Sequence, residues 1–504
     1  TRLTEKGEAR QRLSPYAPPD VYASLLNEIQ ETALGTRLGI PLYFSSDQEG
    51  DFSQDYSRGG VQLFPSAMGL AATDDEDFVY EAYLAVAKQN RAAGIRMLHT
   101  PCLDVNVNPS NPEISTRSFG DDPEDVARFG LAQMKAFRDG GIIATGKHFP
   151  GRGDSAVDVH FAMDVNRADR KRLEEVELYP YRALIREGLP AIMTAHTIYE
   201  AIDPDKPASV SRRVVTGLLR EEMGFEGVIT SDAIGMHGVI SRFSSYGEAC
   251  AAAIAAGNDL VLAKGDPGNV PGAVEWIKRY VEDGRIPLEE LDAHVRRVLK
   301  LKMDYGVFKE PLAEPKRAAK VVRDRKVVRL CLEAAERSAI VVRDRKKLLP
   351  LKRGVKIFFT DQRYDAYHNK AEDYWWHSHM MAEYLRRYSD AVESRETGLE
   401  ITADDEERIL AGAAAADVVV IHSFYWRGNP TNAAIARKVM ATGRPVVLVS
   451  GGPYRESIAI DEADCLLVTF GSSPKCLENA AAVIFGEGRA CGRWPLKHYR
   501  IEGV

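Results

Sequence analysis

Short apolar runs rich in β-branched residues alternate with longer amphipathic stretches through the first half of this chain. Six such runs occur, at residues 38–45, 95–103, 142–148, 190–196, 228–232 and 259–263. The stretches between them, for example 124–138 and 168–187, have the apolar spacing of helices. Strands that alternate with crossover helices pair in parallel. The pattern therefore predicts an α/β fold built on a parallel sheet.

Polar residues stand at or just after the ends of these runs. They are Asp47, Asp104, Lys147, His148, His196 and Asp232. A (β/α)8 barrel carries its active site at the carboxyl ends of its strands, so this distribution predicts a (β/α)8-type, TIM-like barrel. Such a barrel needs eight strands, and six runs are found. Either two βα units precede Thr1 or the barrel closes irregularly, and the start at Thr1 favours the first explanation.

A basic, helical region from Leu288 to Arg337 connects the predicted barrel to the second half of the chain. Its charge runs are typical of solvated helix faces. Strand-like runs return at 338–342, 355–360, 417–422, 445–450 and 465–470. We therefore predict a barrel domain over residues 1–310, a linker over 311–337 and a smaller three-layer α/β/α domain over 338–504.

Charge and cysteine content exclude several classes of function. The formal net charge is −7 with both signs interspersed, so the chain lacks a nucleic-acid footprint and a neutral or small polar ligand is expected. No apolar run is long enough to span a membrane. The six cysteines show no CxxC spacing, which predicts free thiols and a cytoplasmic location. Because the sequence starts at Thr1, a signal peptide upstream stays an open alternative.

The segment from Lys147 to His160 brings four titratable groups together. A strand tip delivers Lys147 and His148, and the glycine-rich loop behind it delivers Asp158 and His160. Residues two apart in an extended segment point the same way, so Asp158 is placed to hydrogen-bond the His160 ring. A carboxylate that orients an imidazole is a recurring general acid/base device. A polar loop with satisfied histidines is the alternative, and the clustering favours a site.

Asp232 is the candidate nucleophile. It ends the apolar run 227–231, so a strand would present its carboxylate at the mouth of the barrel. The same residue is equally suited to cap a following helix. The candidate acid/base pair of His160 and Asp158 favours the catalytic role of Asp232 over helix capping. Glycoside hydrolysis with retention uses a carboxylate nucleophile and a proton donor about 5 Å apart.

These motifs together resemble glycoside hydrolase family 3, and within it the β-N-acetylglucosaminidase branch. The most specific are Lys147-His148-Phe149-Pro150-Gly151, the Asp158-x-His160 pair and Ser231-Asp232. Further matching segments lie in order at 47–50, 64–68, 101–106, 111–112, 117–120 and 193–196. The second half of the chain matches more loosely, at 485–487 and 492–495.

The resemblance implies a role for each matched residue. Asp232 would attack the anomeric carbon, and His160, oriented by Asp158, would be the acid/base. The residues implied to hold or line the sugar site are Asp47, Arg58, Arg117, Lys147, His148, His196 and Met236. Neither a metal nor an organic cofactor is implied.

Three departures from the family pattern bear on specificity. After Gly50 the family continues Gly-Arg-Val, whereas this chain has an apparent insertion in which Arg58 is the candidate replacement for the family's arginine. Arg152 stands where the family commonly has His, and Val159 stands where it commonly has Ser.

We therefore expect a retaining exo-β-N-acetylglucosaminidase that acts on a small carbohydrate, such as a chitin or peptidoglycan fragment. The enzyme alternatives are a β-glucosidase or another family 3 β-glycosidase, and a β-N-acetylglucosaminide phosphorylase in which Arg152 would attract phosphate. The non-enzyme alternative is an inactive sugar-binding relative, which the joint presence of Asp158, His160 and Asp232 argues against.

Overall fold

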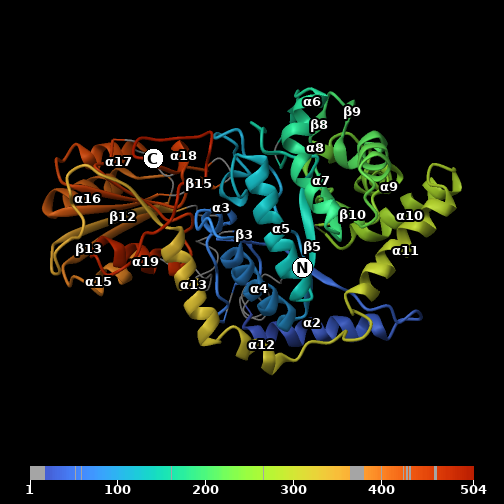
Figure 1. The fold of residues 1–504 in the computed structure, drawn as a ribbon, viewed down its shortest axis with the longest axis horizontal. Coiled ribbons are helices and arrows are strands. Elements are labelled where there is room, and N and C mark those ends of the chain that lie inside the picture. The colour runs from blue at the N-terminus through green and yellow to red at the C-terminus, as the bar shows by residue number, and fades with distance from the viewer. Residues whose placement is uncertain are drawn as a thin grey trace.

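The computed structural model describes residues 17–504 with short gaps. The residues outside the description are 1–16, 52, 58, 161, 265, 364–379, 399, 424, 427–428, 431–432 and 459–461. Arg58, the expected replacement for the family's arginine, is thus outside the described residues. Figure 1 shows two sheet-containing units side by side, with the first half of the chain in the blue-to-green unit and the second half in the orange-to-red one.

The first unit is built on a parallel sheet in the order β1-β4-β5-β7-β10. Its strands are β1 (Phe44–Ser46), β4 (Ile95–Leu98), β5 (Ile143–Phe149), β7 (Ala191–Thr194) and β10 (Val228–Ser231). A parallel bridge between Thr230 and Leu260 adds a sixth position. The strand expected over 38–45 begins only at Phe44, because Gly39 and Pro41 interrupt the run before it. The described residues therefore form a parallel sheet at the six predicted positions, and the eight strands of a full TIM barrel are not found among them.

Helix α11 (Leu288–Asp304) covers the amino-terminal end of this sheet. One apolar cluster joins Val298 and Leu301 of α11 to side chains at or near the amino ends of the strands, namely Tyr43, Met97, Ile143, Ala191, Val228 and Leu260. Because the first and last strand positions both contribute to this cluster, the sheet curls around a common apolar interior.

The same helix links the two edges of the curled sheet. Lys302 Nζ donates to Pro41 O at 2.9 Å next to β1, and Arg297 Nη1 donates to Asp259 Oδ1 at 2.6 Å next to the last position. Helix α11 thus joins the two edges of the curled sheet, which do not pair with each other among the described residues. These contacts also show that the expectation of a fully solvated basic face is wrong for Arg297, since it binds a buried carboxylate.

Amphipathic helices pack around the first sheet where the sequence predicts them. They include α2 (Pro19–Leu34), α4 (Glu76–Ala93) and α5 (Pro123–Asp139). The single helix expected over 168–187 is instead divided into α6 (Arg170–Arg172), the π-helical turn η2 (Leu173–Glu177) and α7 (Tyr179–Arg186). Pro180 explains the division, because it has no amide hydrogen to donate to the preceding turn and is tolerated only in the first turn of a new helix.

The other elements of the first unit are short or lie at its periphery. They are β2 (Gln48–Gly50), β3 (Ser53–Gln54), α3 (Ala67–Ala71), η1 (Ser115–Arg117), β6 (Val165–Asn166), β8 (Ile198–Tyr199), β9 (Asp203–Pro207), η3 (Ala208–Val210), η4 (Arg213–Glu222), α8 (His237–Ile240), α9 (Tyr246–Ala256) and α10 (Asn269–Glu282). No helix in the described part of the chain is long and apolar enough to cross a bilayer.

The second unit is a six-stranded sheet in the order β11-β18-β17-β14-β12-β13. Its strands are β11 (Ile340–Asp344), β12 (Ile357–Arg363), β13 (Val392–Gly398), β14 (Val418–Ser423), β17 (Val446–Ser450) and β18 (Cys465–Val468). All neighbours pair in parallel except β11 with β18. The sequence missed β13, because this edge strand consists largely of charged and polar residues.

Helices flank the second sheet and lead into it. They are α12 (Pro315–Val321), α13 (Arg325–Ser338), α15 (Met380–Arg386), α16 (Ala403–Ala415), α17 (Ala433–Met440), α18 (Arg455–Ile458) and α19 (Pro474–Ile484), with the small ribbon β15 (Tyr425–Trp426) and β16 (Asn429–Pro430). Figure 1 shows α17 and α18 along one side of the sheet and α15 and α19 along the other, as a three-layer arrangement requires. The division into residues 1–310, 311–337 and 338–504 stays a prediction.

The second unit contacts the carboxyl edge of the first sheet. Ser472 N donates to Asp51 Oδ1 at 2.6 Å, and Asn106 Nδ2 donates to the Tyr454 hydroxyl at 2.8 Å. Asp121 accepts hydrogen bonds from three successive backbone amides, those of residues 497–499. The loops that follow β2 and β4 are therefore held from both units.

Candidate active site

Polar side chains from every strand of the first sheet meet at its carboxyl edge. The residues at or just beyond the strand ends are Asp47, His99, Lys147, His148, His196 and Asp232. The sequence predicted all of these positions except His99, which lies between two apolar segments and offers no motif of its own. The strand expected over 95–103 ends already at Leu98, so His99 and not Asp104 follows its end, and the other predicted strand ends meet at this edge.

Lys147 is a buried ammonium between two carboxylates. Its side chain is 3% exposed, and Nζ lies 2.8 Å from Asp47 Oδ1 and also pairs with Glu49. Burial lowers the pKa of Lys147, but these two carboxylates outweigh it and raise the pKa above its usual value. Asp47 is more open, with its side chain 40% exposed. Lys147 and His99 hold the pKa of Asp47 below its usual range against the opposing effect of burial, so this edge offers an ionised acceptor beside an ionised donor.

Glu49 fixes the guanidinium of Arg117. Nε and Nη2 of Arg117 donate to the two carboxylate oxygens at 2.6 and 3.0 Å, which is a bidentate pair. Arg117 Nη2 also lies 3.4 Å from His148 Nε2. The sequence placed Glu49 in a matched motif without giving it a role, although its negative charge is what allows Lys147 and Arg117 to be buried side by side.

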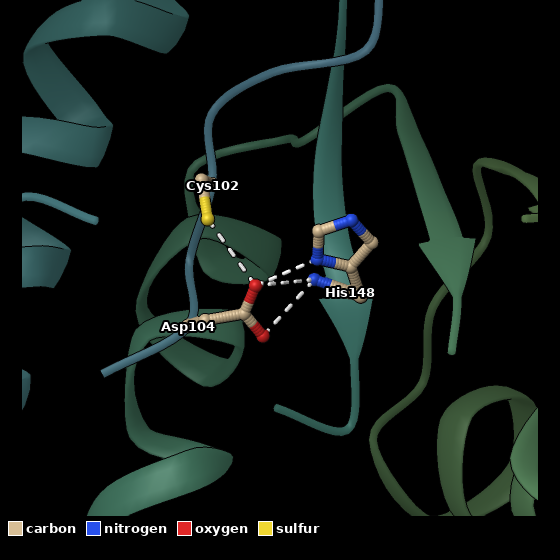
Figure 2. A group of neighbouring side chains, drawn as sticks. All are labelled: Cys102, Asp104 and His148. Atoms are coloured by element: carbon tan, nitrogen blue, oxygen red, sulfur yellow. Dashed lines mark hydrogen bonds and ion pairs between the residues drawn. The ribbon is translucent and has the colours of Figure 1, made fainter. Parts of the chain in front are cut away.

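Cys102, Asp104 and His148 form a buried cluster beneath the edge, and Figure 2 shows the carboxylate between the other two side chains. Asp104 Oδ2 lies 2.7 Å from His148 Nδ1 and accepts from Cys102 Sγ at 3.2 Å, while Oδ1 accepts from Arg152 N at 2.6 Å. Burial raises the pKa of Asp104, but the neighbouring His148 outweighs it and lowers the pKa to about 2. The Cys102 thiol and the His148 ring both lie at hydrogen-bond distance from the Asp104 carboxylate. We therefore interpret the cluster as a support that holds the His148 ring in place.

His160 and Asp158 make the contact that their spacing predicts. His160 Nδ1 lies 2.6 Å from Asp158 Oδ1, which also accepts from the His160 backbone amide at 2.9 Å. The carboxylate is 8% exposed and the ring 22% exposed, so the loop presents a partly accessible imidazole on a buried anion. A carboxylate bound at Nδ1 leaves proton transfer to Nε2.

Asp232 lies just after β10, with a 7% exposed side chain. Its Oδ1 accepts from Ala233 N at 2.7 Å, and its carboxylate interacts electrostatically with His196, His148 and Glu113. Burial raises the pKa of Asp232, but the two histidines and the Ala233 amide lower it below its usual value. Asp232 is thus an ionised carboxylate at neutral pH. It is not the N-cap of a helix, because the next helix, α8, begins only at His237.

His196 and Met236 stand in less direct positions than expected. His196 is fully buried, with Nδ1 2.8 Å from Ser209 Oγ and Nε2 3.0 Å from Ala233 O. Both ring nitrogens are therefore used within the protein, and the ring supports the turn after Asp232. Met236 is half-buried at the start of α8.

Arg152 does not face the site as an exposed cation. Its side chain is 0% exposed, Nη2 lies 2.8 Å from Glu113 Oε2, and Nε donates to Thr197 Oγ1 at 3.2 Å. The idea that this guanidinium attracts an incoming phosphate is therefore wrong, because its charge is buried against a carboxylate. Glu113 was not predicted, since no motif in the sequence sets it apart.

Cysteine chemistry agrees with the sequence. Cys102, Cys250, Cys331, Cys465 and Cys476 are buried free thiols and Cys491 is exposed, with no disulfide among the residues described. Burial raises the pKa of Cys102 well above its usual value, so the thiol beside Asp104 stays protonated.

Comparison with curated proteins finds several glycosidases among the similar sequences. The chain is 33% identical to β-hexosaminidase A from Pseudoalteromonas piscicida over 55% of its length, and 32% identical to a β-N-acetylglucosaminidase/β-glucosidase from Cellulomonas fimi over 55%. In both cases it spans 50% of the relative's length. A β-hexosaminidase from Neisseria meningitidis is 35% identical, with 57% of this chain and 80% of that protein covered.

Solved structures extend the similarity to both units. A glycoside hydrolase family 3 β-N-acetylglucosaminidase from Paenibacillus sp. str. FPU-7 superposes with a TM-score of 0.85 at 28% identity, covering 96% of this chain and 91% of that one. The fold is also similar to that of the β-glucoside phosphorylase BglX, with a TM-score of 0.81 at 22% identity over 96% of this chain and 88% of that one.

The family pattern described as the glycosyl hydrolase family 3 N terminal domain matches residues 16–301, more than half of the chain and all of the strands that carry the candidate site. The chain belongs to glycosyl hydrolase family 3.

Proposed function

We propose that this protein is a retaining exo-β-N-acetylglucosaminidase. The observation that carries the proposal is the 2.6 Å contact between His160 Nδ1 and Asp158 on the loop behind β5. The ionised Asp232 follows β10 in the same unit. A carboxylate nucleophile and a separate proton carrier are the two groups that retention requires. The names of the Cellulomonas fimi relative and of the Paenibacillus structure support N-acetylglucosamine as the sugar, and the β-hexosaminidase relatives agree with it.

The proposed reaction has two displacements. The Asp232 carboxylate attacks the anomeric carbon while the glycosidic C–O bond breaks, and His160 Nε2 gives its proton to the departing oxygen. In the second step His160 takes a proton from water, whose oxygen attacks the same carbon and releases Asp232. Two inversions give net retention. Asp158 holds the ring in position through both steps and stabilises its protonated form.

The polar edge is suited to hold a pyranose. We assign the sugar hydroxyls to Asp47, Lys147, Arg117 and His148, because their charged or fixed donor and acceptor atoms converge there. His196 is assigned a supporting role under Asp232, since both its ring nitrogens bind the protein.

One of the two enzyme alternatives keeps specific support. Activity on β-glucosides is favoured by the Cellulomonas fimi relative, whose name includes both activities, and by the insertion after Gly50, which contains β3 and pairs it with β2. Phosphorolysis is not supported by Arg152, which was expected to attract phosphate, because that side chain is buried and paired with Glu113.

The test is a panel of 4-nitrophenyl β-glycosides assayed with and without 10-fold excess phosphate over substrate. We expect the N-acetylglucosaminide to be the best substrate, with free N-acetylglucosamine as product. Preference for the glucoside would contradict the assigned sugar, and sugar 1-phosphate as the main product in phosphorus NMR would contradict hydrolysis. No turnover of any member would favour an inactive sugar-binding relative.

A further inference from the structure

Glu113 is a buried carboxylate that the proposed reaction does not use. Its side chain is 3% exposed, in the loop that precedes η1. Asn111 ties this loop to the catalytic loop, because Asn111 Oδ1 accepts from the Glu113 amide at 3.0 Å and Asn111 Nδ2 donates to Arg152 O at 2.8 Å. The position of Glu113 relative to the loop behind β5 is therefore fixed by the backbone of both segments.

Glu113 is ionised and faces two guanidinium groups. Arg152 Nη2 lies 2.8 Å from Glu113 Oε2, and Arg117 Nη1 lies 3.7 Å from Oε1. Burial raises the pKa of Glu113, but Arg152 and Arg117 outweigh it and hold the pKa well below its usual value. Arg152 is in turn held by Thr197, whose hydroxyl donates to Asp164 at 2.8 Å.

The other oxygen of the same carboxylate faces the acid/base histidine. Glu113 Oε1 lies 3.6 Å from His160 Nδ1, the atom that also contacts Asp158. Two carboxylates, Asp158 and Glu113, lie beside this ring, and Glu113 in turn interacts with Arg152, Arg117, His148 and Asp232. A negative charge this close favours the protonated ring, and a positive charge behind it weakens that effect.

We propose that Glu113 is a positioning residue of the acid/base unit, the second carboxylate beside His160. Its negative charge helps to keep His160 protonated, and the positive charge of Arg152 limits that effect. The proposal rests on the proposed function, since it assumes that His160 is the proton donor. It also gives a physical reason for the departure at position 152. A buried arginine there needs a counter-charge, and Glu113 supplies it while serving His160.

The test uses two variants that break the same ion pair from opposite sides. Glu113→Gln removes the negative charge, and Arg152→Gln removes the positive charge that offsets it. The assay is the pH dependence of kcat/KM for phenyl β-N-acetylglucosaminide, a substrate whose poor leaving group needs the proton. We expect the alkaline limb to move to lower pH by about one unit in Glu113→Gln and to higher pH in Arg152→Gln.

A merely structural role predicts a different result. Loss of the ion pair would then lower kcat/KM in both variants without moving the limbs in opposite directions, and this outcome would overturn the proposal. Asp203→Asn is the matched control. Asp203 is a buried carboxylate at the start of β9, outside the site, and it accepts a hydrogen bond from Ser211. The pH profile of this variant should match that of the unmodified protein.

If Glu113→Gln does not fold, as judged by circular dichroism, Glu113→Asp takes its place. This variant keeps the charge while drawing the carboxylate back from His160, so we expect a smaller shift in the same direction, and an unchanged limb would contradict the proposal. Failure of the proposed function is recognised separately. In that case the unmodified protein does not turn over the substrate, or His160→Ala turns it over at the same rate.

Discussion

Replacing Asp158 by Asn should slow glycoside cleavage only where the leaving group needs a proton. The carboxylate accepts from His160 Nδ1 at 2.6 Å and from the His160 amide at 2.9 Å, and it is 8% exposed. An amide of the same shape keeps an acceptor oxygen but loses the charge. A charge-assisted hydrogen bond is worth about 1–2 kcal/mol more than a neutral one, which is about 5- to 30-fold in rate.

The assay is kcat/KM for a series of aryl β-N-acetylglucosaminides whose phenols differ in acidity. We expect Asp158→Asn to lower kcat/KM about 5- to 30-fold for phenyl, and to leave 4-nitrophenyl nearly unchanged because a good leaving group departs without protonation. Asp154→Asn is the control, since Asp154 lies exposed on the same loop. Equal losses along the whole series would refute the reasoning and assign Asp158 to binding or loop structure instead.

Two further predictions concern stability. Glu177 is 1% exposed, and burial raises its pKa to about 7, only partly offset by Arg172. Because the folded form holds this proton while the unfolded chain loses it near pH 4.5, stability should fall between about pH 4.5 and 7, and Glu177→Gln should raise the free energy of unfolding by up to about 3 kcal/mol at pH 8 and by almost nothing at pH 4.5. Equal effects in urea titrations at both pH values would contradict this. Asp259→Asn should lower the free energy of unfolding by about 3–5 kcal/mol at pH 7 in the same titration, because the buried carboxylate accepts from Arg297 and pairs with Arg220. A loss below about 1 kcal/mol would contradict the stabilising role of these two ion pairs.

The parts of the fold that follow from local pattern were predictable. The alternation of apolar runs and helices gives the parallel sheet, and the polar residue after each run gives the edge that holds the candidate site. The spacing of Asp158 and His160 was enough to predict their hydrogen bond, because two residues on one short loop leave little choice of geometry.

The parts that depend on distant contacts were not predictable. Helix α11 was visible as a helix, but nothing in its sequence said that it links Pro41 to Asp259 and covers the end of the curled sheet. Arg152 was expected to be an available cation, because its counter-charge Glu113 lies on a separate loop without a motif. Edge strand β13 was missed because burial on neither face is strong enough to impose an apolar alternation.

The identity of the nucleophile is the central claim, and covalent trapping tests it most directly. The reagent is 5-fluoro-β-N-acetylglucosaminyl fluoride, which reacts in the first displacement and slows the second, so that the sugar accumulates on the attacking residue. After proteolysis and mass spectrometry we expect the label on Asp232, and none in Asp232→Ala. A label on another carboxylate, or turnover of this reagent without any label and with inversion of the product, would contradict the account.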